Sequence, residues 1–143
     1  MSDSQQVICI VDDDDAVVRA LARLLMACGY LVRTFPSAQG FLDQPVEIDA
    51  AVCCLIVDVH MPGISGLELQ AALQEAGRPL PIVFVTGAGD AKLRCRAFSD
   101  GAIAFLQKPF GDVELLQAVD QAAAHVQARR AEAVEVLAKK RAL

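Results

Sequence analysis

Short apolar runs that end at polar residues recur along the chain. Val7–Val11, Val52–Val57 and Ile82–Val85 contain no polar alternation, which is typical of strands that are buried on both faces of a parallel sheet. Leu31–Phe35 and Ala102–Leu106 are predicted to be two further short strands. The pattern therefore predicts five strands.

Segments with helical periodicity lie between these strands. After the first strand, Val18, Leu21, Leu25 and Cys28 recur at helical spacing and end at a glycine, as expected of a helix with a glycine C-cap. Pro45–Asp49 is predicted to be a loop. The other predicted helices are Ala38–Leu42, Leu67–Ala76, Ala91–Ser99 and an unbroken segment from about Asp112 to the last residue.

Five βα units in succession predict an α/β fold, a doubly wound parallel sheet with helices on both faces. The polar residues at the strand ends are Asp12 and Asp13 after the first strand, Asp58 after the third, Thr86 after the fourth and Lys108 after the fifth. The carboxyl ends of parallel strands share one edge, where open α/β sheets bind ligands. We therefore expect these residues to converge there.

This set of side chains has a chemistry of its own. Close carboxylates repel one another by about 4 kcal/mol per pair at an effective dielectric constant near 20, and a divalent cation removes that cost. Oxygen ligands favour Mg²⁺, while Lys108 and Thr86 suit phosphate oxygens. Asp58 would then be a nucleophile toward phosphorus that forms an aspartyl phosphate.

Composition supports one domain with an appendage. The 143 residues are 55% hydrophobic and 22% charged, which is sufficient for one sizeable core. The apolar runs are too short to span a membrane, and the polar first residues do not resemble a signal peptide. We expect a cytoplasmic protein without membrane association.

The five cysteines are predicted to be buried reduced thiols. They are Cys9, Cys28, Cys53, Cys54 and Cys95; their number is odd and their spacing does not match a metal site. The adjacent pair is expected to point to opposite faces of its strand.

Charge is distributed unevenly. Residues 1–125 carry a net charge of −8 and residues 126–143 a net charge of +3. With one tyrosine and no tryptophan, the acidic body is a poor nucleic-acid surface, so DNA binding would require sequence outside this chain.

Four motifs, in order and spacing, resemble the CheY-like receiver domain of two-component response regulators over about residues 6–125. They are Asp12-Asp13, the stretch 58–66 (DVHMPGISG), Val85-Thr86-Gly87 and Lys108-Pro109-Phe110. The resemblance implies a flavodoxin-like sheet with strand order 2-1-3-4-5 and an extended last helix.

The resemblance also implies roles for individual residues. Asp58 would be the phosphoacceptor, and Asp13 a direct ligand of Mg²⁺, with Mn²⁺ as an alternative ion. Asp12 would act directly or through water. His60 would lend its backbone carbonyl to the metal, and its side chain lies at the mouth of the site, where the family varies.

Two switch residues follow from the same resemblance. Thr86 would follow the phosphoryl group, Lys108 would pair with it, and Phe105 would move inward as Thr86 moves. Phe105 lacks the hydroxyl that many relatives carry at this position, which alters the hydrogen bonding of the outward and inward states. The Lys108–Pro109 peptide bond is expected to be cis.

The predicted organisation has three parts: residues 1–6 disordered, residues 7–125 a receiver domain, and residues 126–143 a helical extension. A heptad pattern in the extension is interrupted by charged and small residues, which indicates a linker. The extension resembles the linker that precedes the DNA-binding domain of FixJ-type regulators, so we expect a piece of a transcriptional regulator. His125 is predicted to lie on the helix surface.

The predicted function is to accept a phosphoryl group from a sensor histidine kinase. The surface of helix four, strand five and helix five would then change and form a homodimer that controls transcription. The chain would not be an enzyme beyond its own phosphotransfer and slow autodephosphorylation. Two alternatives remain open: an aspartyl-phosphate phosphatase, which usually needs an aspartate where His60 stands, and a receiver-like interaction module that never takes phosphate.

Overall fold

A computed structural model of the chain describes residues 6–87 and 91–142. Its centre is a five-stranded parallel sheet with the order β2-β1-β3-β4-β5, which confirms the predicted fold class and strand order. The strands are β1 (Val7–Val11), β2 (Leu31–Phe35), β3 (Val52–Asp58), β4 (Ile82–Thr86) and β5 (Ala104–Gln107).

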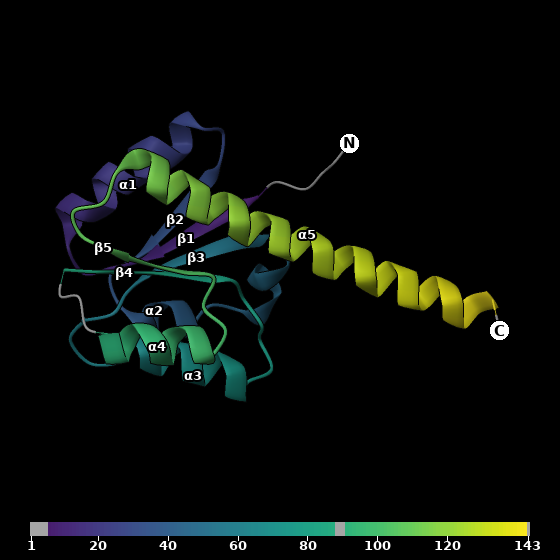
Figure 1. Cartoon of the computed structure of the whole chain (residues 1–143). Coiled ribbons are helices and arrows are strands. Elements are labelled where there is room, and N and C mark those ends of the chain that lie inside the picture. Colours follow the sequence, from purple (N-terminus) through teal and green to yellow (C-terminus); the bar gives the residue numbers. More distant parts are fainter. Residues whose placement is uncertain (1–5, 88–90, 143) are drawn as a thin grey trace.

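Helices cover both faces of the sheet (Figure 1). α1 and α5 lie on one face, and α2, α3 and α4 lie on the other; the second half of α5 projects away from the domain. Their bounds are α1 (Asp15–Ala27), α2 (Ala38–Leu42), α3 (Gly66–Glu75), α4 (Ala91–Ser99) and α5 (Asp112–Ala142), with a 3₁₀ helix η1 (Val46–Ala50) before β3.

Polar side chains fix where the helices begin. The Asp14 carboxylate accepts backbone N–H groups of the first turn of α1. Ser65 and Glu68 form a reciprocal capping box at the start of α3. Such caps satisfy N–H groups that have no partner within the helix. They therefore set the start of each helix close to the carboxyl edge of the sheet.

The core consists of two layers, one on each side of the sheet. Leu55, Val57 and Phe84 face α2, α3 and α4, whereas Ile56 and Val85 face α1 and α5. All seven residues of β3 are buried, because this strand is central and covered on both faces. The carboxylate at its end is thus held in a rigid, fully packed element.

Two predicted boundaries were wrong, and both have a local cause. Pro45–Asp49, predicted to be a loop, overlaps η1, whose turns are closed by i→i+3 hydrogen bonds such as Ala51 N–H to the Ile48 carbonyl. The fifth strand begins at Ala104, two residues later than predicted. The Ala102 N–H group is instead part of the C-terminal cap of α4, where it donates to Ala97 at 3.0 Å.

The adjacent cysteines of β3 lie on the same face of the sheet, which contradicts the prediction. The pairing of β1 with β3 shifts register between Val7 and Ile8, which pair with Val52 and Cys54. Cys53 is therefore the extra residue of a β-bulge, where the strict alternation of faces is interrupted. Both thiols consequently face the α1 and α5 layer.

The prediction that all five thiols are buried is correct for three of them. Cys9, Cys53 and Cys54 are buried, whereas Cys28 and Cys95 are exposed. The two exposed thiols lie at the end of α1 and on α4, outside the buried residues of these helices.

Other sequence predictions concern the two ends of the chain. His125 is exposed on α5, as predicted. The N-terminal segment predicted to be disordered lies outside the described residues except for Gln6. Among the described residues, no helix is both long enough and apolar enough to cross a membrane.

Candidate functional site

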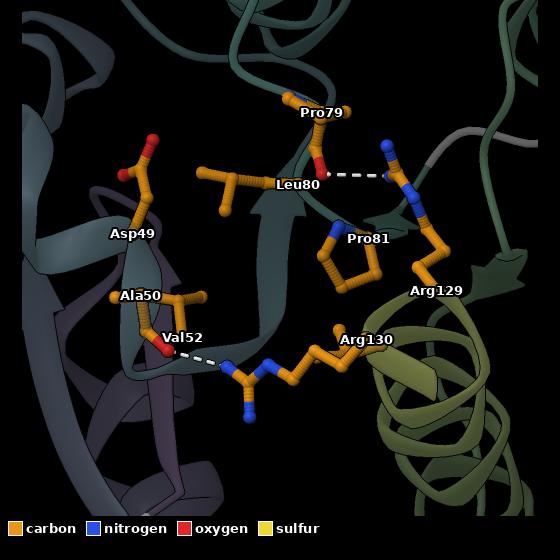
Figure 2. A pocket seen from close by; sticks show the side chains of 9 residues that line it. Asp49, Ala50, Val52, Pro79, Leu80, Pro81, Arg129 and Arg130 are labelled. Carbon is orange, nitrogen blue, oxygen red and sulfur yellow. Dashed lines mark hydrogen bonds between the residues drawn. The ribbon is translucent and has the colours of Figure 1, made fainter. Parts of the chain in front are cut away.

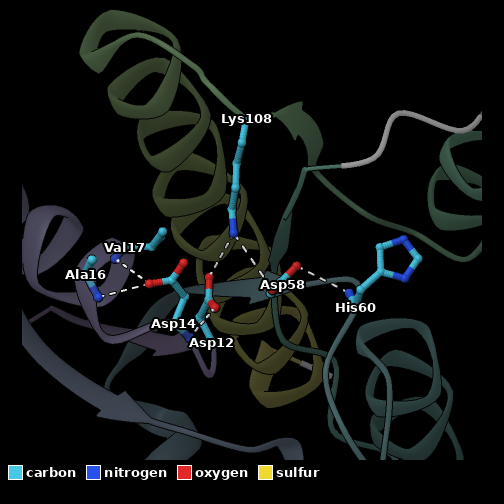
Figure 3. Close-up of polar contacts among 7 residues, drawn as sticks. All are labelled: Asp12, Asp14, Ala16, Val17, Asp58, His60 and Lys108. Carbon is cyan, nitrogen blue, oxygen red and sulfur yellow. Dashed lines mark hydrogen bonds and ion pairs between the residues drawn. The ribbon is translucent and has the colours of Figure 1, made fainter.

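Two carboxylates and one ammonium group meet at the carboxyl edge of the sheet (Figure 3). The Lys108 Nζ atom lies 3.3 Å from Asp12 Oδ2 and 3.8 Å from Asp58 Oδ2. Asp12 is 2% exposed and Asp58 is 7% exposed. The lysine therefore bridges two buried carboxylates that come from neighbouring strands.

Successive aspartates in the acidic turn after β1 have different contacts. Asp12 Oδ1 accepts the backbone N–H of Asp14 at 2.9 Å, which fixes its orientation, and Asp14 in turn caps α1. Asp13 is exposed and free of that capping role. One carboxylate oxygen from each of Asp12, Asp13 and Asp58 lies within 4.8 Å of the others, so the structure brings the predicted acidic cluster together.

Asp58 lies at the end of β3, where burial and neighbouring charges shift the pKa of its carboxyl. Burial raises the pKa of its carboxyl above the ordinary value, and the neighbouring Asp12 raises it further. Lys108 and the backbone N–H of His60, which donates to Asp58 Oδ1 at 3.2 Å, lower this pKa. Burial and the Asp12 carboxylate prevail, so the net shift of the Asp58 pKa is upward.

Lys108 and Thr86 are joined through the backbone. The Lys108 N–H group donates to the Thr86 carbonyl at 2.7 Å, and the Lys108–Pro109 peptide bond is cis, as predicted. Thr86 is fully buried at the end of β4. These contacts place both residues at the same edge as Asp58.

Phe105 lies inside the protein in this structure. Its side chain is largely buried in the core layer that faces α2, α3 and α4, and its ring centroid is 6.2 Å from that of Phe84. The Phe105 ring is therefore already buried in this structure, and its movement with Thr86 stays a prediction. His60, in contrast, is exposed, and its imidazole points away from the acidic cluster (Figure 3).

Gly66 supports the site and was not singled out from the sequence. A Cβ atom at this position would lie 2.6 Å from the Asp58 carbonyl oxygen and 3.0 Å from the Val59 Cα atom. The first turn of α3 can therefore approach the end of β3 only because residue 66 has no side chain. A glycine directly after the capping residue Ser65 was the available signal in the sequence.

The donor set suits a small divalent cation. Asp12, Asp13 and Asp58 offer carboxylate oxygens, which are the ligands that Mg²⁺ prefers. Burial, followed by the neighbouring Asp12 carboxylate, raises the pKa of Asp58, and a bound cation would offset the repulsion between the two carboxylates. These residues therefore fit the metal that the resemblance implies.

Comparison with known proteins agrees with this geometry. A family model described as the response regulator receiver domain matches residues 8–120. The chain belongs to this family. Receiver domains are parts of two-component response regulators, which are signalling proteins rather than conventional enzymes. The acidic cluster and Lys108 of this receiver domain lie inside the matched region.

Curated relatives are longer than this receiver domain. It is 44% identical over 119 residues to the response regulator protein TmoT of Ectopseudomonas mendocina, covering 83% of this chain and 53% of that protein. It is 44% identical over 110 residues to the transcriptional regulatory protein FixJ of Azorhizobium caulinodans, covering 77% and 51%. The chain thus spans about half the length of these relatives.

A solved structure shows the same architecture. The response regulator StyR is 39% identical and superposes with a TM-score of 0.81, covering 94% of this chain and 67% of that one.

Proposed function

We propose that this receiver domain accepts a phosphoryl group from a sensor histidine kinase on Asp58. The observation that supports the proposal is the bridge that Lys108 forms between Asp12 and Asp58 at the carboxyl edge of the sheet. A buried carboxylate beside a lysine, with an acidic pair that can hold a cation, is suited to attack a phosphorus atom.

The transfer is a nucleophilic substitution at phosphorus. A carboxylate oxygen of Asp58 attacks the phosphorus atom of a phosphohistidine whose other ring nitrogen carries a proton. An O–P bond forms, the P–N bond breaks with its electron pair going to nitrogen, and the imidazole leaves as the neutral base. Lys108 holds a phosphoryl oxygen by its ammonium group, and the Thr86 hydroxyl donates to another. The backbone N–H of His60 keeps Asp58 oriented for the attack.

Asp12, Asp13 and Asp58, together with the His60 carbonyl, would hold Mg²⁺ or Mn²⁺. When bound, this ion supplies positive charge that favours the developing charge of the phosphoryl group. Both carboxylates accept a backbone N–H and lie near Lys108, but the contacts of Asp12, at 2.9 Å and 3.3 Å, are shorter than those of Asp58, at 3.2 Å and 3.8 Å. Asp58 is therefore the less tightly held of the two and the one proposed to react.

Phosphorylation would act on the domain through Thr86 and Phe105. Thr86 is drawn toward the phosphoryl oxygens, and the buried Phe105 ring occupies the space beside Phe84. The surface formed by α4, β5 and α5 then favours a homodimer. A size-exclusion mass that stays constant when a phosphoryl mimic binds would remove dimerisation from the proposal.

Transcriptional control is the proposed output. One relative is named a transcriptional regulatory protein, and this chain spans about half of it. Residues 7–125 would be the receiver domain, and the helical residues 126–142 would link it to a DNA-binding domain outside this chain. DNA contact would be made by that domain alone, since the receiver body is acidic.

Intact mass spectrometry tests the phosphoacceptor directly. The protein is incubated with Mg²⁺ and a small acyl phosphate, alongside Asp58→Asn and the exposed control Asp120→Asn. We expect one added phosphoryl group in the parent and in Asp120→Asn, and none in Asp58→Asn. If no protein gains mass although Mg²⁺ binding is demonstrated, the chain is a phosphate-independent interaction module. Sustained turnover of a generic phosphate ester would instead favour a phosphatase.

A further inference from the structure

Two consecutive arginines attach helix α5 to the amino edge of the sheet, where the parallel strands begin (Figure 2). Arg129 Nη1 donates to the Pro79 carbonyl at 3.1 Å, and Arg130 Nη2 donates to the Ala50 carbonyl. Pro79 precedes β4, and Ala50 precedes β3. The contacts therefore lie at the amino edge of the sheet, opposite the acidic cluster.

The two segments that receive the arginines are joined to each other. The Arg78 guanidinium donates two hydrogen bonds to the Asp49 carboxylate, both at 2.8 Å. The side chains are only 9% and 20% exposed, and the guanidinium carbon also lies 5.5 Å from the centre of the Phe41 ring. A bidentate, largely buried pair of this kind holds planar geometry, so the segments before β3 and β4 form one stiff platform.

The helix and this platform do not form a continuous packed surface. A hollow of about 270 Å³ lies between them, and Val52, Leu80, Pro81 and Val126 line it together with the two arginines (Figure 2). A hollow lacks part of the close side-chain contact that a packed junction provides. The two guanidinium groups supply hydrogen bonds across this junction.

The second half of α5 projects away from the domain (Figure 1). Residues 131–141 are all exposed, and among them Val134 is 66% exposed and Leu137 is 55% exposed. Arg130 is therefore the last residue of α5 with a recorded contact to the platform in the described part of the chain.

We propose that Arg129 and Arg130 form a latch that fixes the direction in which the helical extension leaves the receiver domain. Its receiving surface is the pair of carbonyl groups of Ala50 and Pro79, held at a set separation by the Arg78–Asp49 pair. The same two strands end at Asp58 and Thr86, so the latch joins the extension to the strands that carry the candidate site.

Distances between spin labels test the latch. One label is placed on the exposed Cys28 at the end of α1 and the other on Ala138→Cys, in a Cys95→Ser background; the three remaining thiols are buried. The latch variant is Arg129→Gln/Arg130→Gln. The matched control is Arg19→Gln/Arg23→Gln, which removes the same charge from two exposed arginines of α1.

We expect a single narrow distance distribution in the parent and in the control, and a distribution at least twofold wider in the latch variant. Amide exchange at residues 126–132 should accelerate about tenfold in the latch variant alone, while circular dichroism shows a folded domain. An unchanged distribution and unchanged exchange would show that helix stiffness alone sets the direction, and would overturn the proposal. The measurements use neither Mg²⁺ nor a phosphodonor, so they are independent of the proposed phosphotransfer.

Discussion

The backbone N–H of Lys108 donates to the carbonyl oxygen of Thr86 at 2.7 Å. This bond continues the pairing of β4 with β5 by one residue beyond the end of β5. It fixes the point from which the lysine side chain reaches across to β1 and β3. The position of the ammonium group is thus determined by the sheet.

Replacing Lys108 by Met should expose the repulsion between the carboxylates it bridges. The backbone bond to Thr86 remains, but Asp12 and Asp58 lose their shared cation. We expect the free energy of unfolding in the presence of a chelator to fall by roughly 1–2 kcal/mol. Urea denaturation measures this, with exposed Lys139→Met as the control. Equal stability of parent and variant would show that the bridge is energetically neutral.

The same variant should respond more strongly to Mg²⁺. A cation that binds only the folded state stabilises it, and it would replace the positive charge that the variant lacks. The loss of stability caused by Lys108→Met should therefore be smaller in Mg²⁺ than in chelator. A loss of equal size in both conditions would contradict this expectation.

Asp58→Asn should change how stability depends on pH. In the folded protein, the pKa of the Asp58 carboxyl is raised above its ordinary value of 3.8. The folded state therefore keeps the Asp58 proton up to a higher pH than the unfolded chain does. The parent therefore loses stability as pH rises from 3.8 through the folded pKa, and the loss is complete above it. The amide cannot ionise and avoids this loss.

In chelator, the Asp58→Asn variant should be more stable than the parent by about 1 kcal/mol at neutral pH. The difference should disappear toward pH 3, where the Asp58 carboxyl is protonated in both states. Thermal unfolding at a series of pH values measures it, and exposed Asp120→Asn serves as the control. A stability difference between Asp58→Asn and the parent that grows as pH falls would contradict this prediction.

Gly66→Ala should displace the end of β3. The new Cβ atom would lie 2.6 Å from the Asp58 carbonyl oxygen, which is backbone and cannot rotate away. We expect a destabilisation of roughly 2–3 kcal/mol and slower gain of the phosphoryl group. Gly111→Ala is the matched control, since no atom lies within 4 Å of its added Cβ. Parent-like stability of Gly66→Ala would show that α3 can shift at little cost.

Thiol reactivity should divide the five cysteines into two groups. Burial raises the pKa of Cys9 and of Cys53 to about 11 and that of Cys54 well above its ordinary value, so these thiols stay protonated and inaccessible near neutral pH. We expect a maleimide to add rapidly to Cys28 and Cys95 only, and to all five in denaturant. Rapid addition of a third group to the native protein would show that the sheet opens at β3 or β1.

The fold could be predicted from the sequence because the three central strands of its sheet, β1, β3 and β4, are covered on both faces. Val52–Val57 and Ile82–Val85 can be identified by composition alone, and each is followed by the polar residue that reaches the carboxyl edge. Because parallel strands share that edge, residues far apart along the chain, such as Asp12 and Lys108, could be expected to meet. The structure confirms that they do.

What the sequence did not reveal depends on contacts between segments. The β-bulge at Cys53 follows from the register of β1 against β3, which periodicity within one strand does not contain. The role of Gly66 depends on how closely α3 approaches β3. Similarly, the contacts of Arg129 and Arg130 depend on where a long helix passes the ends of two other strands. Charge in the extension alone indicated only a solvated linker.

The length of α5 gives its attachment a mechanical consequence. At 1.5 Å per residue, residues 131–142 extend about 18 Å beyond Arg130. A change of about 10° in the tilt of the helix at that point would move its far end by roughly 3 Å. This displacement is comparable to the donor–acceptor distance of a hydrogen bond. A rearrangement too small to disturb the core could therefore become, at the end of this lever, a different position for whatever the helix carries.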